Sequence, residues 1–122
     1  MGVRKKVLVV EDYHDVRRMM SIMLRQYGFD VVEASDGYEA VEKALEEHPD
    51  MIFMDLAMPI LDGVNAVKAM RMHDELKDVP IVAVTAYHDF YAEKAKAVGC
   101  NAVIQKPLDF DQLQPLVNRY SH

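Results

Sequence analysis

Cysteine and tryptophan are nearly absent from this chain, which has one cysteine, Cys100, and no tryptophan. A single cysteine cannot form a disulfide within the chain, so the composition favours a reducing compartment, and we expect a cytoplasmic protein. Cys100 stands where a helix is expected to give way to a strand, and we interpret it as small buried filler. The histidines are scattered without the spacing of metal ligands, which argues against a zinc site.

Long apolar runs and long basic runs are also missing. No apolar stretch is long enough to cross a bilayer, and the chain does not open with a signal-peptide pattern, so we expect no membrane partner. The formal net charge is -6 and the basic cluster at residues 4–6 is short, which argues against direct binding to nucleic acid. The 122 residues, of which 51% are hydrophobic and 28% charged, predict one globular domain over residues 1–122.

The most informative stretch is residues 51–63. Four apolar residues lead directly into Asp55, and Pro59 and the pair Asp62-Gly63 follow as turn signals. A continuous apolar run with these boundaries is typical of a central strand that is covered on both faces. Asp55 is therefore expected at the carboxyl end of that strand, the edge where open α/β sheets bind their ligands.

Apolar patterns on either side predict alternating strands and helices. The predicted strands cover residues 6–10, 30–34, 51–55, 79–84 and 102–105, and the predicted helices cover about residues 15–27, 37–48, 63–72, 89–98 and 109–120. This alternation predicts an α/β fold with helices on both faces of a parallel sheet. For five strands, a doubly wound sheet of order 2-1-3-4-5 with five helices fits best, and right-handed connections leave few alternatives.

The first predicted helix has two distinct faces. Arg18, Ile22 and Arg25 are expected to face outward, and an isoleucine between two arginines suits either a docking surface or an ordinary solvated face. Gly28 is expected to end this helix in a left-handed conformation, and Asp36 to cap the next helix. The expected inward face consists of Val16, Met19, Met20, Met23, Leu24 and Tyr27.

Acidic residues follow the two strands that meet at the switch point of this topology. Glu11 and Asp12 come after the first strand, and Asp55 ends the third. Like charges roughly 5 Å apart repel by about 3 kcal/mol per pair at an effective dielectric constant of about 20, so we expect a bound cation. Mg²⁺ suits the site because it prefers oxygen ligands. Asp12 and Asp55 are the expected direct ligands, Glu11 is expected to act through water, and the carbonyl of Ala57 completes the set.

Lys106 and Thr85 each follow another predicted strand and should meet the same edge. An ammonium group on the far side of the acidic cluster, with a hydroxyl between, makes a pocket for a tetrahedral dianion. An aspartate in such a pocket attacks phosphorus and carries the phosphoryl group as a mixed anhydride, so Asp55 is the expected nucleophile. Each residue alone has an ordinary structural explanation, whereas their joint arrival at one edge favours a site.

Taken in order, these residues resemble the motifs of a response-regulator receiver domain of two-component signalling, in the layout of the chemotaxis-type single-domain regulators. The resemblance covers nearly the whole chain and implies a flavodoxin-like fold and a protein that is not a turnover enzyme. The matching residues are Glu11-Asp12, the segment from Asp55 to Gly63, Thr85-Ala86 and Lys106-Pro107.

The resemblance also implies roles for these residues. Asp55 would receive a phosphoryl group from a phosphohistidine of a sensor histidine kinase or a histidine phosphotransfer protein. Mg²⁺ would be held by Asp12, Asp55 and the Ala57 carbonyl. Glu11 would support the metal site, and Lys106 would bind a phosphoryl oxygen. The phosphorylated domain would then act on a downstream protein target or an attached output domain.

The switch is also inferred from the resemblance, with one departure. Thr85 would move toward the phosphoryl group, and kinase docking would involve the first helix. The family usually has an aromatic residue three positions before the conserved lysine, and Val103 stands there in this chain. A stiff β-branched side chain cannot swing as a ring does. Tyr87 or Tyr91 is a candidate substitute.

Three other classes of function are weighed. A Mg²⁺-dependent phosphatase of the haloacid dehalogenase type would need a second acid two residues after the nucleophile, where this chain has Ala57. A phosphorylation-independent module on this fold would usually have lost an acid or the lysine, and this chain keeps them all. A flavin- or nucleotide-binding domain would need a phosphate-binding loop after the first strand, where Tyr13-His14 stand instead.

Overall fold

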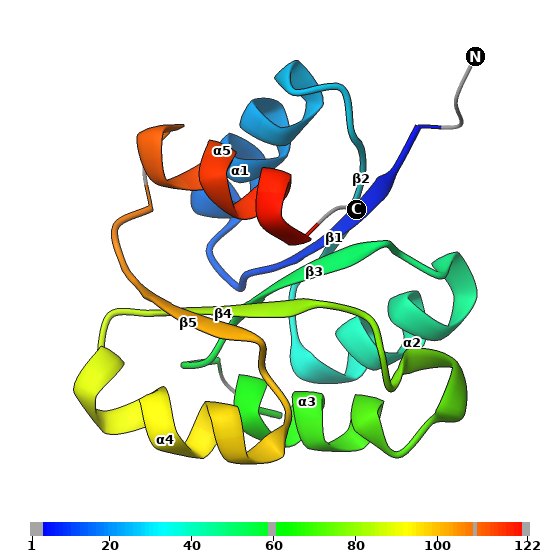
Figure 1. Cartoon of the computed structure of the whole chain (residues 1–122), viewed down its shortest axis with the longest axis vertical. Helices are drawn as coiled ribbons and strands as arrows, with labels where there is room; N and C mark the ends of the chain where they lie inside the picture. The colour runs from blue at the N-terminus through cyan, green and yellow to red at the C-terminus, as the bar shows by residue number, and fades with distance from the viewer. Residues whose placement is uncertain (1–3, 59–60, 109, 121–122) are drawn as a thin grey trace.

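The computed structural model describes residues 4–58, 61–108 and 110–120 (Figure 1). Every predicted strand and helix is present, with end points shifted by at most one or two residues, and one short 3-10 helix is added. The elements are β1 (Lys6–Val10), α1 (His14–Gln26), β2 (Asp30–Ala34), α2 (Gly37–Glu47), β3 (Met51–Asp55), α3 (Gly63–Arg71), η1 (Asp74–Leu76), β4 (Ile81–Thr85), α4 (His88–Val98), β5 (Ala102–Gln105) and α5 (Phe110–Tyr120).

The strands form one parallel sheet in the order β2-β1-β3-β4-β5, which confirms the predicted fold class. β1 and β3 are neighbours, with Val10 opposite Met54, so the residues that follow β1 lie beside Asp55. β4 lies on the other side of β3, and its last residue, Thr85, is opposite Gln105 at the end of β5. The register therefore brings the ends of four strands to one edge of the sheet.

Apolar side chains of the strands alternate between two cores. In β3, Met51 and Phe53 belong to the core shared with α1 and α5, whereas Ile52 and Met54 belong to the opposite core. Figure 1 shows α1 and α5 on one face of the sheet and α2, α3 and α4 on the other. All residues of β3 are buried, and burying a large apolar side chain contributes roughly 1.5–3 kcal/mol. The packing of β3 on both faces therefore fixes the position of the Asp55 backbone.

Side-chain caps and left-handed residues set where the helices begin and end. At the start of α2, Asp36 accepts the backbone N–H of Glu39, which confirms the cap expected there. Asp62 caps α3 in the same way by accepting the N–H of Asn65. Gly28 follows α1 with a φ of 93°, the left-handed conformation expected for it. Asp36 and Asp62 thus fix the starts of two helices at the edge of the sheet where β3 ends.

One expectation about α1 is wrong. Met19, expected on the inner face, is 50% exposed, while Ser21 is buried. The serine is tolerated there because its hydroxyl donates to the carbonyl of Arg17, one turn earlier, over 2.9 Å. Arg18 and Ile22 are exposed, as expected.

Two element boundaries also differ from the prediction. β4 begins at Ile81 rather than Val79, because Pro80 has no N–H for the ladder and takes part only as an acceptor, from Ile52. The predicted first residue of α5, Asp109, lies outside the described residues, as do residues 59–60 of the central loop. Within the described ranges, no helix is both long and apolar enough to cross a membrane.

Candidate functional site

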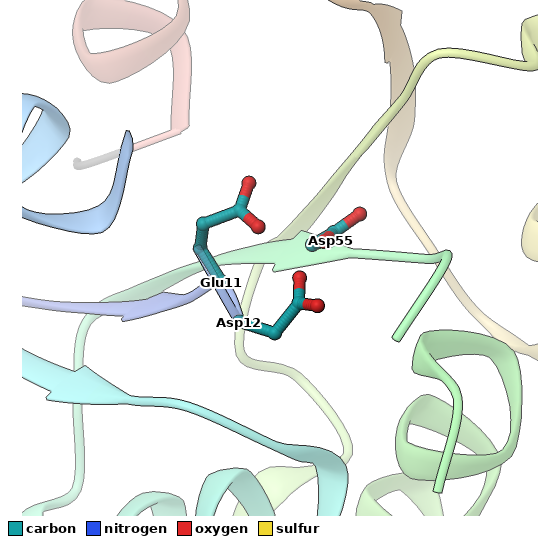
Figure 2. A group of neighbouring side chains, drawn as sticks. All are labelled: Glu11, Asp12 and Asp55. Carbon is teal, nitrogen blue, oxygen red and sulfur yellow. The ribbon is translucent and has the colours of Figure 1, made fainter. Parts of the chain in front are cut away.

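Three carboxyl groups meet at the edge where β1 and β3 end. Asp55 is the last residue of β3, and Glu11 and Asp12 follow β1 directly. One oxygen atom from each of the three residues lies within 4.8 Å of the others. Figure 2 shows the Asp12 carboxyl group directed toward Asp55, with Glu11 on the same backbone segment. The structure therefore brings together the three acidic residues singled out in the sequence.

Burial decides how charge is distributed within this cluster. Glu11 and Asp55 are only 2% and 4% exposed. Burial first, and then the hydrogen bond and negative charge of Glu11, raise the pKa of Asp55 to about 8. Burial acts on Glu11 in the same direction, but hydrogen bonds, first that from Lys106, outweigh it and hold the pKa of Glu11 below its usual value. The two carboxyl groups therefore differ: Lys106 favours the charged form of Glu11, whereas burial and Glu11 disfavour the charged form of Asp55.

Lys106 contributes a positive charge to the cluster from the end of β5. Its Nζ donates to Glu11 Oε1 over 2.7 Å and lies 3.4 Å from Asp55 Oδ1. Burial alone would lower the pKa of Lys106, but the two carboxyl groups outweigh it and raise that pKa. Lys106 is therefore charged at neutral pH.

A second basic residue fixes the backbone of the acidic pair. Arg17, on the first turns of α1, donates from Nη1 to the carbonyl of Glu11 over 2.8 Å and from Nε to Glu33 Oε1 over 3.1 Å. The N–H of Glu11 donates to the carbonyl of Ala34 over 3.1 Å. The peptide groups on both sides of Glu11 are thus held in place. Sequence reasoning missed Arg17, because nothing in its spacing separates it from the exposed arginines of the same helix.

The oxygen atoms of the cluster fit a hard cation. Asp12 Oδ1 is buried and has no hydrogen-bond partner among the described residues. An unpaired buried carboxylate oxygen is costly, and a bound cation would supply the missing partner. Both oxygens of Glu11 are already occupied, by Lys106 Nζ and by the N–H of Tyr13. An all-oxygen donor set of this kind suits Mg²⁺ better than zinc or copper.

Thr85 and Ala57 also lie at this edge, with contacts that the sequence did not indicate. Thr85 is fully buried, and its Oγ1 accepts the N–H of Tyr87 over 3.0 Å. Among the described residues, this hydroxyl contacts the Tyr87 backbone rather than the carboxyl groups of the cluster. The Thr85 carbonyl accepts the N–H of Lys106 over 2.8 Å. Ala57 donates its N–H to Asp55 Oδ1 over 3.2 Å.

Gly63 is packed directly against the backbone of the site. A Cβ atom there would overlap the carbonyl oxygen of Asp55 and lie 2.7 Å from the Cα of Leu56. The N–H of Gly63 donates to the carbonyl of Leu56 over 3.1 Å. The sequence marked this glycine as a turn signal, but its part in placing Asp55 depends on close backbone packing, which only the fold reveals.

An apolar cavity of about 380 Å³ adjoins the cluster, between α1 and the segment that follows β5. Its lining includes Met19, Met20 and Leu108 together with Lys106. A shallower groove, also lined by Met19, continues along α1 past Arg18 and Ile22. The exposure of Met19 is explained by this position, because it lies between the cavity and the groove. The Lys106–Pro107 peptide bond beside the cavity is cis.

Comparison with known proteins gives one consistent result. Residues 7–118 match the family model of the response regulator receiver domain. The regulatory protein AtoC of Escherichia coli (strain K12) is 36% identical over 120 residues, which cover 98% of this chain and 26% of AtoC, so the chain spans about a quarter of that relative.

Solved structures with the same fold are also similar in sequence. The chemotaxis protein CheY4 of Vibrio cholerae superimposes with a TM-score of 0.91 at 34% identity, covering 97% of this chain and 99% of that one. The receiver domain of a sensor histidine kinase from Pseudomonas aeruginosa superimposes with a TM-score of 0.91 at 32% identity, covering 98% of each chain. That kinase domain was solved with a magnesium ion coordinated in its active-site cleft.

Proposed function

The chain belongs to the response regulator receiver domains, the phosphoacceptor modules of two-component signalling, and from this premise we propose that Asp55 is the residue that accepts the phosphoryl group. One observation carries the proposal. Asp55 stands at the carboxyl end of the central strand, with Lys106 Nζ 3.4 Å from its Oδ1 and a second acid, Asp12, within 4.8 Å. We further propose that residues 1–122 form a single receiver domain.

A carboxylate oxygen of Asp55 attacks the phosphorus of a phosphohistidine, the phosphorus–nitrogen bond breaks, and the electron pair of that bond leaves with the donor imidazole. The product is a mixed anhydride on Asp55. The Lys106 ammonium compensates the negative charge of the transferred group, so positioning and charge neutralisation supply most of the catalysis. The phosphorylated Asp55 is itself the signal in this proposal, so the domain is proposed not to be a turnover enzyme.

Asp12, Asp55 and the carbonyl of Ala57 are the groups that would hold Mg²⁺, with Glu11 acting through water. Asp12 Oδ1, which has no hydrogen-bond partner in the described part of the chain, supports this assignment, as does the occupation of both Glu11 oxygens by other donors. When bound, Mg²⁺ supplies positive charge that favours the ionised form of Asp55 and offsets the charge of the phosphoryl group. Attack requires that ionised form, and the pKa of Asp55 is raised to about 8 by burial and by Glu11.

The proposed phosphoryl donor is a sensor histidine kinase or a histidine phosphotransfer protein, docked on α1. Ile22 is 49% exposed on this helix, Arg18 lies beside it, and the groove between them leads through Met19 to the cavity next to Lys106. The cavity reaches Lys106, whose Nζ lies 3.4 Å from Asp55 Oδ1, so this surface suits a partner that must bring its histidine to Asp55. The downstream target is a protein or an attached output domain that responds to the movement of Thr85. The single buried cysteine supports a cytoplasmic location.

The proposal is tested by labelling the protein with a small phosphodonor. Wild-type protein and Asp55→Asn are incubated with acetyl phosphate and Mg²⁺, and intact masses are measured. We expect one added phosphoryl mass in the wild type and none in Asp55→Asn. Asp78→Asn, which removes an exposed carboxylate far along the chain from the site, is the matched control and should label as the wild type does. Equal labelling of Asp55→Asn would refute the assignment of the acceptor.

A further inference from the structure

The segment that joins β4 to α4 is held by one side chain from the neighbouring strand. Gln105, the last residue of β5, donates from Nε2 to the carbonyl of Ala86 over 2.9 Å and accepts the N–H of His88 at Oε1 over 3.2 Å. The same Nε2 also donates to the carbonyl of Lys106 over 3.3 Å. The two bonds from Gln105 to Ala86 and His88 are called the Gln105 bridge below.

The residue that donates a hydrogen bond to the Thr85 hydroxyl lies within the bridged segment. Tyr87 lies between the two bridged residues, and its N–H donates to Thr85 Oγ1. On the other strand, Lys106 follows Gln105 directly and donates its N–H to the Thr85 carbonyl. Two groups of the proposed phosphoryl site, the Thr85 hydroxyl and the Lys106 side chain, are therefore connected to one another through the backbone that Gln105 fixes.

The bridge also supplies a cap that α4 lacks. Tyr87, at the N-cap position, makes no side-chain hydrogen bond to the helix. The N–H of His88 belongs to the first turn, where helix donors have no partner within the helix. Gln105 provides that partner from another element, so its side chain fixes the start of α4 together with the loop before it.

Val103 stands where the family usually has an aromatic residue, and it does not connect β5 to the β4–α4 loop in the way that Gln105 does. It is 8% exposed and packs in the core formed with α2, α3 and α4. As a short β-branched side chain, it has no second position at the surface comparable with that of a ring. The hydrogen bonds of Gln105 instead join the end of β5 to the β4–α4 loop.

We propose that Gln105 is a positioning residue that sets the cost of moving Thr85 toward a phosphoryl group on Asp55. This inference rests on the proposed function. Movement of Thr85 carries Tyr87 with it through their hydrogen bond, and the bridge restrains the residues on both sides of Tyr87. Removal of the bridge therefore makes the movement easier and increases the population of the form that binds the phosphoryl group.

The test uses beryllofluoride, a non-transferable mimic of the phosphoryl group, with Mg²⁺ and the whole chain. Binding is followed by fluorine NMR for the wild type and for Gln105→Met, which keeps the side-chain length and removes both hydrogen-bonding groups. We expect Gln105→Met to bind the mimic roughly 3- to 10-fold more tightly, the range set by about one ordinary hydrogen bond. Gln114→Met, on an exposed position of α5, is the matched control and should bind as the wild type does.

A double-mutant cycle separates this role from a merely structural one. In Thr85→Val there is no hydroxyl to be moved, so adding Gln105→Met should give no further gain in affinity. An equal gain in both backgrounds would overturn the inference, as would unchanged or weaker binding by Gln105→Met. A lower melting temperature without a gain in affinity would assign Gln105 to stability alone and would also overturn it.

Failure of the proposed function gives a different result. If the wild type itself does not bind beryllofluoride in the presence of Mg²⁺, then the assignment of Asp55 falls and the inference about Gln105 falls with it. If the wild type binds and Gln105→Met is indistinguishable from it, only the inference about Gln105 falls.

Discussion

Lys106 donates from Nζ to Glu11 Oε1 over 2.7 Å, joining the end of β5 to the end of β1 across 95 residues of sequence. The pair crosses the edge at which Asp55 stands, and the same ammonium lies 3.4 Å from Asp55 Oδ1. The Lys106 charge thus faces three carboxyl groups, and Asp12 keeps a buried oxygen that has no hydrogen-bond partner among the described residues. The arrangement stabilises the charge of Glu11 and leaves Asp12 Oδ1 as an oxygen that a cation can bind.

Removal of the Lys106 charge should destabilise the fold. In Lys106→Met the nearly buried Glu11 loses the hydrogen bond that chiefly lowers its pKa, so a charged acceptor is left poorly satisfied. We expect the free energy of unfolding to fall by about 1–3 kcal/mol in urea titrations at neutral pH. Lys77→Met, at an exposed position after η1, should change it little. Equal effects of the two substitutions would show that the Lys106–Glu11 pair contributes nothing.

Stability without Mg²⁺ should depend on pH through Asp55. Burial and Glu11 raise the pKa of Asp55 from 3.8 to about 8, so the folded protein binds this proton more tightly than the unfolded chain. The stability from that proton is fully present below about pH 4 and is lost as the pH rises toward about 8. Asp55→Asn removes both the titration and a repulsion of up to about 3 kcal/mol.

The measurement is thermal or urea unfolding of both proteins in chelator at about pH 5 and about pH 8. The gain in stability from Asp55→Asn should be larger at the higher pH. Asp78→Asn serves as the control, because its carboxylate is exposed and should give no gain that grows with pH. A gain from Asp55→Asn that is the same at both pH values would mean that Asp55 is ionised throughout.

Much of this architecture follows from the sequence, because β1, β3 and β4 are apolar enough to require burial on both faces and Asp55 directly ends one of them. The strand order and the meeting of the acidic residues follow from that alternation. Contacts that depend on side-chain conformation do not. The bond from Tyr87 to Thr85 Oγ1 and the Gln105 bridge join residues whose types are common in any loop, so no pattern identifies them.

Helical periodicity was also insufficient to define the inner face of α1. Met19 is exposed although it is apolar, because it lines the cavity between α1 and Leu108. Ser21 is buried although it is polar, because its hydroxyl donates to the carbonyl of Arg17. The position of a helix over its sheet decides such edge residues, and that position is set by packing of the whole domain rather than by the helix sequence.

Substitution of Gly63 should disturb the site as well as the fold. In Gly63→Ala the added Cβ meets the Asp55 carbonyl and the Leu56 backbone, neither of which can rotate away as a side chain would. We expect a loss of about 1–3 kcal/mol in unfolding free energy, together with weaker Mg²⁺ binding measured by calorimetry.

Gly28→Ala is the comparison for this prediction. Its Cβ would meet nothing within 4 Å, but its φ of 93° is unfavourable for alanine, so it should lose about 1–2 kcal/mol and keep its affinity for Mg²⁺. If Gly63→Ala bound Mg²⁺ as tightly as Gly28→Ala does, the close packing of Gly63 would have no part in placing Asp55.

A charge on the exposed face of α1 should separate docking from chemistry. Ile22→Asp places a carboxylate in the groove along α1, so phosphotransfer from a histidine kinase should slow by at least about tenfold, the loss that corresponds to about 1.4 kcal/mol. Labelling by acetyl phosphate, which needs no docking surface, should be unchanged. Met72→Asp changes an exposed apolar residue after α3 and should affect neither reaction. Equal slowing of both reactions by Ile22→Asp would place its effect in the site instead.

The position of the phosphoryl group tests both the role of Asp55 and its dependence on Mg²⁺. Wild-type protein is incubated with acetyl phosphate in Mg²⁺ or in EDTA, digested, and sequenced by tandem mass spectrometry. We expect one phosphoryl group on Asp55 in Mg²⁺ and almost none in EDTA. A phosphoryl group on another residue, or labelling of Asp55 that does not depend on Mg²⁺, would contradict this expectation.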